Sequence, residues 1–328
     1  MNYALLPKIE LHLHLDCSLS YTVVKTLDPT VTPDQYQKEF VAPSVCTDLR
    51  DYLTRAVKGF SLMQTSEQLR LVTLDLLAQL DADNVVYAEI RFAPLLHTQQ
   101  GLSSVQVVEA VQGALQEGAV IYKVIPRLIL CTLRHFTEEQ SLETANLTKA
   151  FFGKGWVVGF DMAGDEAAYS VEAHKKAFTL IKDHGIPFTV HAGEAAGPAS
   201  MWEVLNELGP KRIGHGVRSI EDPKLVNYLI EKKIHLEVCP TSNLQTNIFR
   251  SMQEHSLNLL QRQGVSISIS SDARMITPVT LSSEYDQLSA AFGWGGAELL
   301  ACNLQALQYA FIDEDLKTSL KQQLLAAY

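Results

Sequence analysis

Two histidines separated by a single residue stand near the start of the chain, in the segment KIELHLHLD of residues 8–16. In an extended strand, side chains two residues apart point to the same face, so His12 and His14 are expected to lie side by side. Two neighbouring imidazoles can form one wall of a zinc site. A solvated or structural pair is the alternative, although burying two unpaired imidazoles would be costly. The pair therefore predicts a metal site on this strand.

A second cluster, His191-Ala-Gly-Glu194, follows the apolar run that begins at Phe188. A histidine at the end of a strand can supply a third nitrogen to a metal. The Ala-Gly pair permits a tight turn, which would bring Glu194 toward the same pocket. We interpret Glu194 as a proton carrier beside the metal rather than as a ligand. The alternative is an ordinary glutamate at the start of a helix.

Two further polar residues follow predicted strands. His215 stands between two glycines, which allow the backbone to approach a ligand closely. Asp272 follows the alternating run that starts at Val265 and offers an oxygen ligand or a base. Arg91 is expected in a structural ion pair, and His235 and Cys239 as packed side chains. Solvated or locally bonded rings are expected for His97, His135, His174, His184 and His255.

Bringing these residues together requires a fold in which the ends of several strands meet. Short β-rich runs alternate with segments of helical period, such as residues 67–80, where apolar side chains recur on one face. Eight strands separated by helices predict a parallel sheet closed into a (β/α)₈ barrel, whose strand ends share one mouth. The expected strands are Ile9–Leu15, Val85–Phe92, Tyr122–Leu130, Val157–Met162, Phe188–Ala192, Arg212–Gly214, His235–Cys239 and Ser266–Ser270.

The remaining segments are compatible with one barrel domain over residues 1–328. Additional helices are expected after the first strand and at the C-terminus, where residues 297–310 and 314–327 have a helical period. Asp28–Asp48 is expected to be an irregular excursion rather than a domain boundary. A doubly wound open sheet is the alternative, but no Gly-x-Gly-x-x-Gly follows the first strand.

The composition argues against several classes of protein. Of 328 residues, 47% are apolar and 20% are charged, which is typical of a globular protein. No apolar run approaches the ~20 residues of a membrane span, and the first residues do not resemble a secretory signal. The net charge is −10, from 27 basic and 37 acidic residues, so neither a nucleic acid nor a membrane is expected as a partner. Five scattered cysteines predict reduced thiols and a cytoplasmic location.

The order of these motifs resembles the adenosine deaminase family of the amidohydrolase superfamily. Besides the segments above, the resemblance includes residues 86–92 (VYAEIRF), 159–166 (GFDMAGDE), 212–216 (RIGHG), 238–243 (VCPTSN) and the pair Ser271-Asp272. It implies a (β/α)₈ barrel with one catalytic zinc ion per chain. It also implies hydrolytic deamination of a 6-aminopurine nucleoside, with adenosine or deoxyadenosine as the default small-molecule partner.

The resemblance also assigns roles to the candidate residues. Glu194 would protonate the ring nitrogen beside the attacked carbon, and His215 would orient the water and help to deprotonate it. Asp272 would take part in catalysis in addition to binding the metal. The metal ligands would be His12, His14, His191 and Asp272.

Two expected substrate contacts depart from the family pattern. Cys17 stands where the family commonly has glycine, next to Asp16, which would contact a sugar hydroxyl. Ala273 stands where many members have a second acidic residue that reads the purine N7. Arg274, or another donor on the loop through Thr277, is an alternative reader of N7. The full set expected against the substrate is His14, Asp16, the backbone amide of Gly164, and Ala273.

These departures leave the identity of the substrate open. The alternative substrates are adenine itself and a modified adenine nucleoside, either of the aminofutalosine type or substituted at N6. A binuclear amidohydrolase would need a lysine at the end of the fourth strand, where the sequence has Asp161-Met-Ala-Gly. A non-catalytic purine-binding protein would be expected to lack a ligand or the acid, and none is missing.

Overall fold

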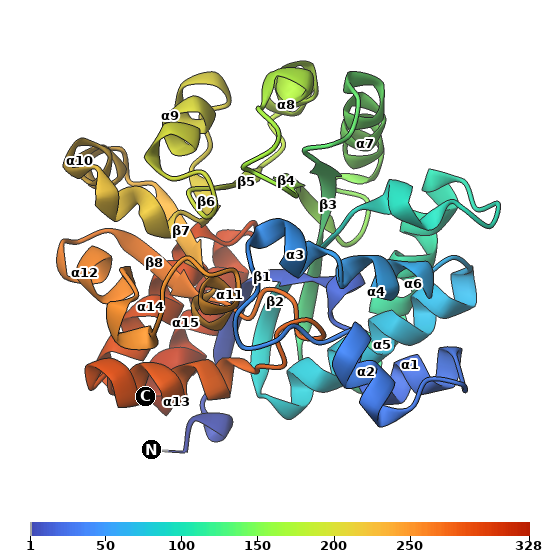
Figure 1. The fold of residues 1–328 in the computed structure, drawn as a ribbon, viewed down its shortest axis with the longest axis horizontal. Coiled ribbons are helices and arrows are strands. Elements are labelled where there is room, and N and C mark those ends of the chain that lie inside the picture. The colour runs from blue at the N-terminus through green and yellow to red at the C-terminus, as the bar shows by residue number, and fades with distance from the viewer. Residues whose placement is uncertain (1) are drawn as a thin grey trace.

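A computed structural model describes residues 2–328 of the chain. The strands of the protein form the inner wall of a barrel (Figure 1). All neighbouring strands are parallel, as a (β/α)₈ barrel requires. The strands are β1 (Lys8–His14), β2 (Val85–Phe92), β3 (Ile125–Leu133), β4 (Val157–Ala163), β5 (Thr189–Ala192), β6 (Arg212–His215), β7 (His235–Val238) and β8 (Ser266–Ile269).

Two short bridges join the sheets β1–β4 and β5–β8 into a closed barrel. On one side, the N–H of His14 donates to Asp272 O at 2.7 Å, and the N–H of Asp272 donates to His12 O at 3.0 Å. On the other side, the N–H of Phe160 donates to Pro187 O at 3.1 Å. The prediction of a closed barrel is confirmed, and its closure sets three expected metal ligands side by side.

Helices alternate with the strands and form the outer layer (Figure 1). Several begin with a reciprocal capping box, for example at Thr65 with Gln68 and at Thr137 with Gln140, which satisfies the first free N–H groups. The outer helices are α5 (Ser66–Ala82), α6 (Ser104–Ile121), α7 (Glu138–Phe151), α8 (Lys175–Asp183), α9 (Pro198–Glu207), α10 (Pro223–Lys232), α11 (Pro240–Gln245), α12 (Leu257–Arg262), α13 (Leu281–Phe292), α14 (Gly296–Tyr309) and α15 (Glu314–Ala327).

The expected additional helices are present at both places. After β1 come α1 (Tyr21–Leu27), α2 (Pro33–Glu39), α3 (Leu49–Leu53) and α4 (Ala56–Ser61). Helix α3 lies across the front of the barrel in Figure 1. At the C-terminus, α14 packs against β8 and β1.

The prediction of an irregular stretch over Asp28–Asp48 was wrong, because the stretch contains α2. Pro33 occupies the first helical turn, where its missing N–H costs nothing, and Thr32 and Gln35 form a capping box. The third strand begins at Ile125 rather than at Tyr122, because the N–H of Tyr122 still closes the last turn of α6 on Gly118 O. Among residues 2–328, none of the helices combines the length and the apolar character needed to cross a membrane.

Candidate metal centre and active site

Four predicted ligands converge at the mouth of the barrel. His12 and His14 come from β1, His191 from β5, and Asp272 from the segment after β8. The Nε2 atoms of His14 and His191 are 3.1 Å apart, and Asp272 Oδ1 lies 3.5 Å from His12 Nε2 and 3.6 Å from His14 Nε2. His12 Nε2 is buried and has no hydrogen-bond partner among the described residues. Three imidazole nitrogens and one carboxylate oxygen are suitable donors for a divalent metal ion, which would satisfy this orphaned atom.

The backbone at the mouth is shaped to bring these ligands together. Asp272 adopts a left-handed conformation with φ 62°, which an aspartate tolerates better than most residues. Gly214 has no side chain where one would collide, because an added Cβ would stand 2.7 Å from His12 Cε1. Of the two glycines beside His215, Gly214 therefore allows the expected close approach to the backbone. The group that approaches it is the ring of His12.

Two buried carboxylates orient the histidine ligands from behind. His12 Nδ1 lies 2.9 Å from Glu237 Oε2, and His191 Nδ1 lies 3.2 Å from Asp161 Oδ2. Arg91 joins the two carboxylates, since Nη1 donates to Asp161 Oδ2 and Nη2 to Glu237 Oε2, each at 2.8 Å. Such carboxylate partners fix the ring so that Nε2 is directed at the metal. The expected ion pair of Arg91 is confirmed, but sequence reasoning missed both carboxylates.

These carboxylates remain ionised in spite of their burial. Burial alone would raise the pKa of Asp161, but the charges of His191 and Arg91 bring it below its usual range. Burial opposes ionisation of Glu237 as well, but Arg212 and Arg91 hold the pKa of that carboxyl well below its usual value. The site is therefore backed by a buried network of paired charges.

Glu194 and His215 lie beside the predicted ligands. Glu194 Oε2 is 3.5 Å from His215 Nε2, and Glu194 Oε1 accepts hydrogen bonds from Asn243 Nδ2 and Thr246 Oγ1 at 3.2 Å each. Burial raises the pKa of Glu194 well above its usual range, and the charge of Asp272 raises it further. Burial lowers the pKa of His215 well below its usual value. Both shifts favour a protonated carboxyl group beside a neutral imidazole, which suits proton donation by Glu194.

Two cavities meet at this site. A small cavity of about 50 Å³ is bounded by His191, Glu194, His215 and Ala273. A larger cavity of about 280 Å³ shares His14, Cys17 and Gly164 with it and extends over Asp16 and Asp165. Most of the exposed wall of the larger cavity is apolar, including Leu53, Val57, Phe60, Leu96 and Leu133. Every expected substrate contact therefore borders one of the two cavities.

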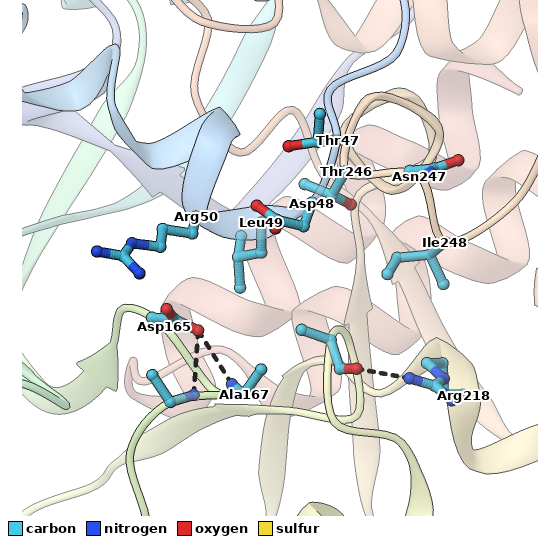
Figure 2. A pocket seen from close by; sticks show the side chains of 12 residues that line it. Thr47, Asp48, Leu49, Arg50, Asp165, Ala167, Arg218, Thr246, Asn247 and Ile248 are labelled. Carbon is cyan, nitrogen blue, oxygen red and sulfur yellow. Dashed lines mark hydrogen bonds between the residues drawn. The ribbon is translucent and has the colours of Figure 1, made fainter.

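An outer cavity of about 430 Å³ lies next to the site (Figure 2). Its wall includes Thr246, whose hydroxyl reaches Glu194, and Ala195, whose carbonyl oxygen accepts a hydrogen bond from Arg218. Asp165 accepts hydrogen bonds from the N–H groups of Ala167 and Ala168, which shapes the loop after β4. The cavity thus borders two of the loops that carry candidate site residues.

The structure contradicts the hypothesis that Arg274 reads N7. The Arg274 side chain is directed away from both inner cavities, with Nε donating to Ser271 Oγ at 3.0 Å and Nη2 to Asp83 Oδ2 at 3.2 Å. Thr277 donates its hydroxyl to Gln245 Oε1 at 2.6 Å. Arg274 Nε and Nη2 and the Thr277 hydroxyl therefore already have partners, and neither residue borders the two inner cavities.

The other histidines divide into two groups. His135 and His184 are exposed, as expected, but His97, His174 and His255 are buried. Each buried ring has hydrogen-bond partners in the fold; His174, for example, lies 3.0 Å from Ser141 Oγ and 3.2 Å from Arg134 O.

Cys239 and His235 are buried, as predicted for packed side chains. The donor atom of Cys239 nevertheless lies within 4.8 Å of those of His12, His215 and Asp272. Sequence reasoning also missed Glu166, Asn243 and Thr246 as site residues. The first two lie inside the motifs GFDMAGDE and VCPTSN, but spacing alone does not reveal their contacts.

The closed barrel and the His₃Asp cluster at its mouth, beside the buried carboxyl group of Glu194, define a metal-dependent hydrolase of the (β/α)₈ class. Residues 7–327 match the profile of the family described as Adenosine deaminase. The chain is similar to an adenosine deaminase of Enterococcus faecalis, with 36% identity over 98% of this chain and 97% of that protein. One from Clostridium acetobutylicum is 34% identical over 97% of each chain. The chain therefore belongs to the adenosine deaminase family.

Solved structures show the same fold. An adenine deaminase from Arthrobacter aurescens has a TM-score of 0.90 at 23% identity and covers 98% of each chain. An N6-mAMP deaminase from Arabidopsis has a TM-score of 0.89 at 24% identity and covers 99% of each chain. These likenesses confirm the predicted barrel architecture.

Proposed function

We propose that this protein hydrolyses the 6-amino group of a purine nucleoside, converting adenosine or deoxyadenosine to inosine or deoxyinosine and ammonia. The observation that carries the proposal is the buried carboxyl group of Glu194 beside a His₃Asp cluster in a member of the adenosine deaminase family. A hydrolase for this reaction must activate water and protonate the ring at the same place, and these groups provide both functions.

The proposed cofactor is one zinc ion per chain. His12, His14, His191 and Asp272 would hold it, and an N₃O donor set suits zinc. When bound, the ion supplies Lewis-acid activation of a water molecule at neutral pH. The support from this chain is the unpartnered His12 Nε2 and the two carboxylates that hold the other nitrogens of His12 and His191.

Glu194 is proposed to donate its proton to N1 while the water oxygen forms a bond to C6. The C6–N6 bond then breaks, and ammonia leaves with one of the two water protons. The other returns to Glu194 as the C6 carbonyl forms, so that the product keeps the proton on N1. The neutral His215 ring lies 3.5 Å from the Glu194 carboxyl and would orient the water and accept its proton. Asp272 would assist as a base from the opposite side, where Ser242 Oγ fixes its Oδ2 at 2.7 Å.

The cavities favour a nucleoside over a nucleotide. The small cavity would take the purine, with the N–H of Gly164 and the methyl group of Ala273 against its edges. The larger cavity would take the sugar, with His14 and Asp16 near its hydroxyl groups. Its wall includes the carboxylates of Asp16 and Asp165, and no Lys or Arg among the described residues borders it. A phosphate dianion would be repelled there.

Deamination of a modified adenine is the second candidate, because Ala273 offers no polar group to N7. The Arthrobacter relative in fold is an adenine deaminase, and the Arabidopsis one acts on N6-mAMP. The proposal also includes a single domain over residues 1–328 and reduced, cytoplasmic thiols, supported by five free cysteines. A nucleic acid or a membrane as partner is not part of the proposal.

An ammonia-release assay tests the substrate directly. Zinc-loaded protein is compared on adenosine, deoxyadenosine, adenine, AMP and N6-methyladenosine. We expect the highest kcat/KM for adenosine or deoxyadenosine and at least a tenfold lower value for AMP, about 1.4 kcal/mol of discrimination. Methylamine is measured for N6-methyladenosine, because its hydrolysis at C6 releases methylamine in place of ammonia. A preference for adenine or N6-methyladenosine would establish the second candidate, and absence of both amines from every reaction would refute both.

A further inference from the structure

One buried carboxylate outside the predicted site binds the loop that carries Glu194. Glu166 follows β4 and is 6% exposed. Its carboxylate accepts hydrogen bonds from four consecutive backbone N–H groups, those of Gly193, Glu194 at 3.0 Å, Ala195 at 2.8 Å and Ala196 at 3.2 Å. Among residues 2–328, the hydrogen bonds of this carboxylate all come from backbone N–H groups, and the charges of Arg134 and Arg218 act on it from farther away.

Consecutive backbone N–H groups that point at one anion form a nest, a concave conformation that the bound anion stabilises. Gly193 supplies the turn, with φ 71°, and an added Cβ would collide with Met201. Removing the anion would leave the four N–H groups, two of them in buried residues, without this partner. The conformation of Gly193–Ala196, and with it the direction of the Glu194 side chain, therefore depends on Glu166.

The same residue is tied to the opposite end of the proposed purine site. Glu166 is two residues from Gly164, whose N–H is proposed to contact the purine. Arg134 connects β4 to β5, because its N–H donates to Ala163 O at 2.8 Å and its Nη2 donates to His191 O at 2.9 Å. The cavity in Figure 2 is bordered by the loop of Asp165 and Ala167. It is also bordered by the neighbouring segment that Arg218 binds.

We propose that Glu166 is a positioning residue that fixes the separation between Gly164 and Glu194, so that a purine held at Gly164 presents N1 to the Glu194 carboxyl. The inference rests on the proposed role of Glu194 as the proton donor. A glutamate that merely stabilised the two loops would contribute to folding but not specifically to proton delivery.

A double-mutant cycle separates these roles. Gln at position 166 has one acceptor oxygen, and its NH₂ group would face backbone donors. We expect Glu166→Gln to lower kcat at least tenfold in the otherwise unchanged protein, with about one zinc per chain retained. In a Glu194→Gln background, the same substitution should change kcat less than about twofold, because the proton donor that Glu166 positions is no longer present.

Asp222→Asn is the matched control. Asp222 is also a carboxylate that accepts two hydrogen bonds, from Trp202 Nε1 and the N–H of Lys224 at 2.9 Å each, but it lies near the surface and borders neither inner cavity. We expect it to lower the Tm without changing kcat. If Glu166→Gln does not fold, Glu166→Asp is measured in the same cycle, since it keeps the charge but shortens the side chain.

Three results would count against the inference. An unchanged kcat in the position-166 variant, or an equal fold-loss in both backgrounds, would overturn it and leave the role of Glu194 standing. Near-normal turnover of Glu194→Gln alone would instead refute the proposed proton donor, and the inference with it.

Discussion

Replacing Asp161 by Asn tests whether the charges behind the ligands set the affinity for metal. Asp161 Oδ1 accepts from His191 Nδ1 at 3.3 Å, Oδ2 accepts from Arg91 Nη1 at 2.8 Å, and the carboxylate is fully buried. An amide has one acceptor oxygen, so either His191 or Arg91 would face an NH₂ group. The variant keeps all four proposed ligands and changes only what orients one of them.

The expected loss follows from that single contact. Removing a partner behind a metal-bound histidine typically weakens metal binding by about 10- to 100-fold. This range corresponds to about 1.4–2.8 kcal/mol and is similar to the ~1.5–3 kcal/mol of a hydrogen bond to a charged group. We therefore expect the Kd for zinc to rise by one to two orders of magnitude, measured by competition with a chelator of known affinity.

Glu89→Gln provides the control, because it removes another buried carboxylate from the same network. Glu89 Oε2 accepts from Arg212 Nη1 at 2.6 Å and contacts no proposed ligand. Both variants should lose stability, since breaking a buried ion pair costs about 3–5 kcal/mol. Only Asp161→Asn should lose zinc affinity. A Kd within twofold of the unchanged protein, or an equal loss in Glu89→Gln, would refute the reasoning.

Four further predictions concern acid catalysis, substrate recognition, pH and packing. Glu194→Gln should keep one zinc per chain and lose about 10² or more in turnover; loss of the metal by elemental analysis would make Glu194 a ligand instead. Because Ala273 offers no hydrogen bond and Arg274 is turned away, 7-deazaadenosine should retain kcat/KM within about tenfold of adenosine, and a hundredfold loss would contradict this. Burial raises the pKa of Glu284 from 4.5 to about 8, so the folded protein binds an extra proton in that window and loses stability as pH rises through it. Urea unfolding at pH 5 and pH 8 should show Glu284→Gln gaining stability relative to the unchanged protein at the higher pH. Gly214→Ala should displace the His12 ring and lower zinc content, whereas full occupancy would show that the barrel accommodates the added methyl group.

The local pattern of the sequence predicted the barrel and the residues that gather at its mouth. The two-residue spacing of His12 and His14 places them on one face of a strand, and polar residues at strand ends meet wherever parallel strands close into a barrel. Both consequences depend only on backbone geometry, so they could be predicted without coordinates. The family resemblance, confirmed over residues 7–327, added the expected chemistry.

Only the tertiary structure decided which charges support that site. Arg91 lies 70 residues from Asp161 and 146 residues from Glu237, and no local period relates such positions. The same holds for Glu166, whose partners at 193–196 follow an intervening helix. Arg274 follows the metal-binding segment directly, yet its side chain is bound by Asp83 from another part of the chain. Strand spacing fixes which face a residue occupies, whereas burial and distant partners determine its charge, its direction and its hydrogen bonds.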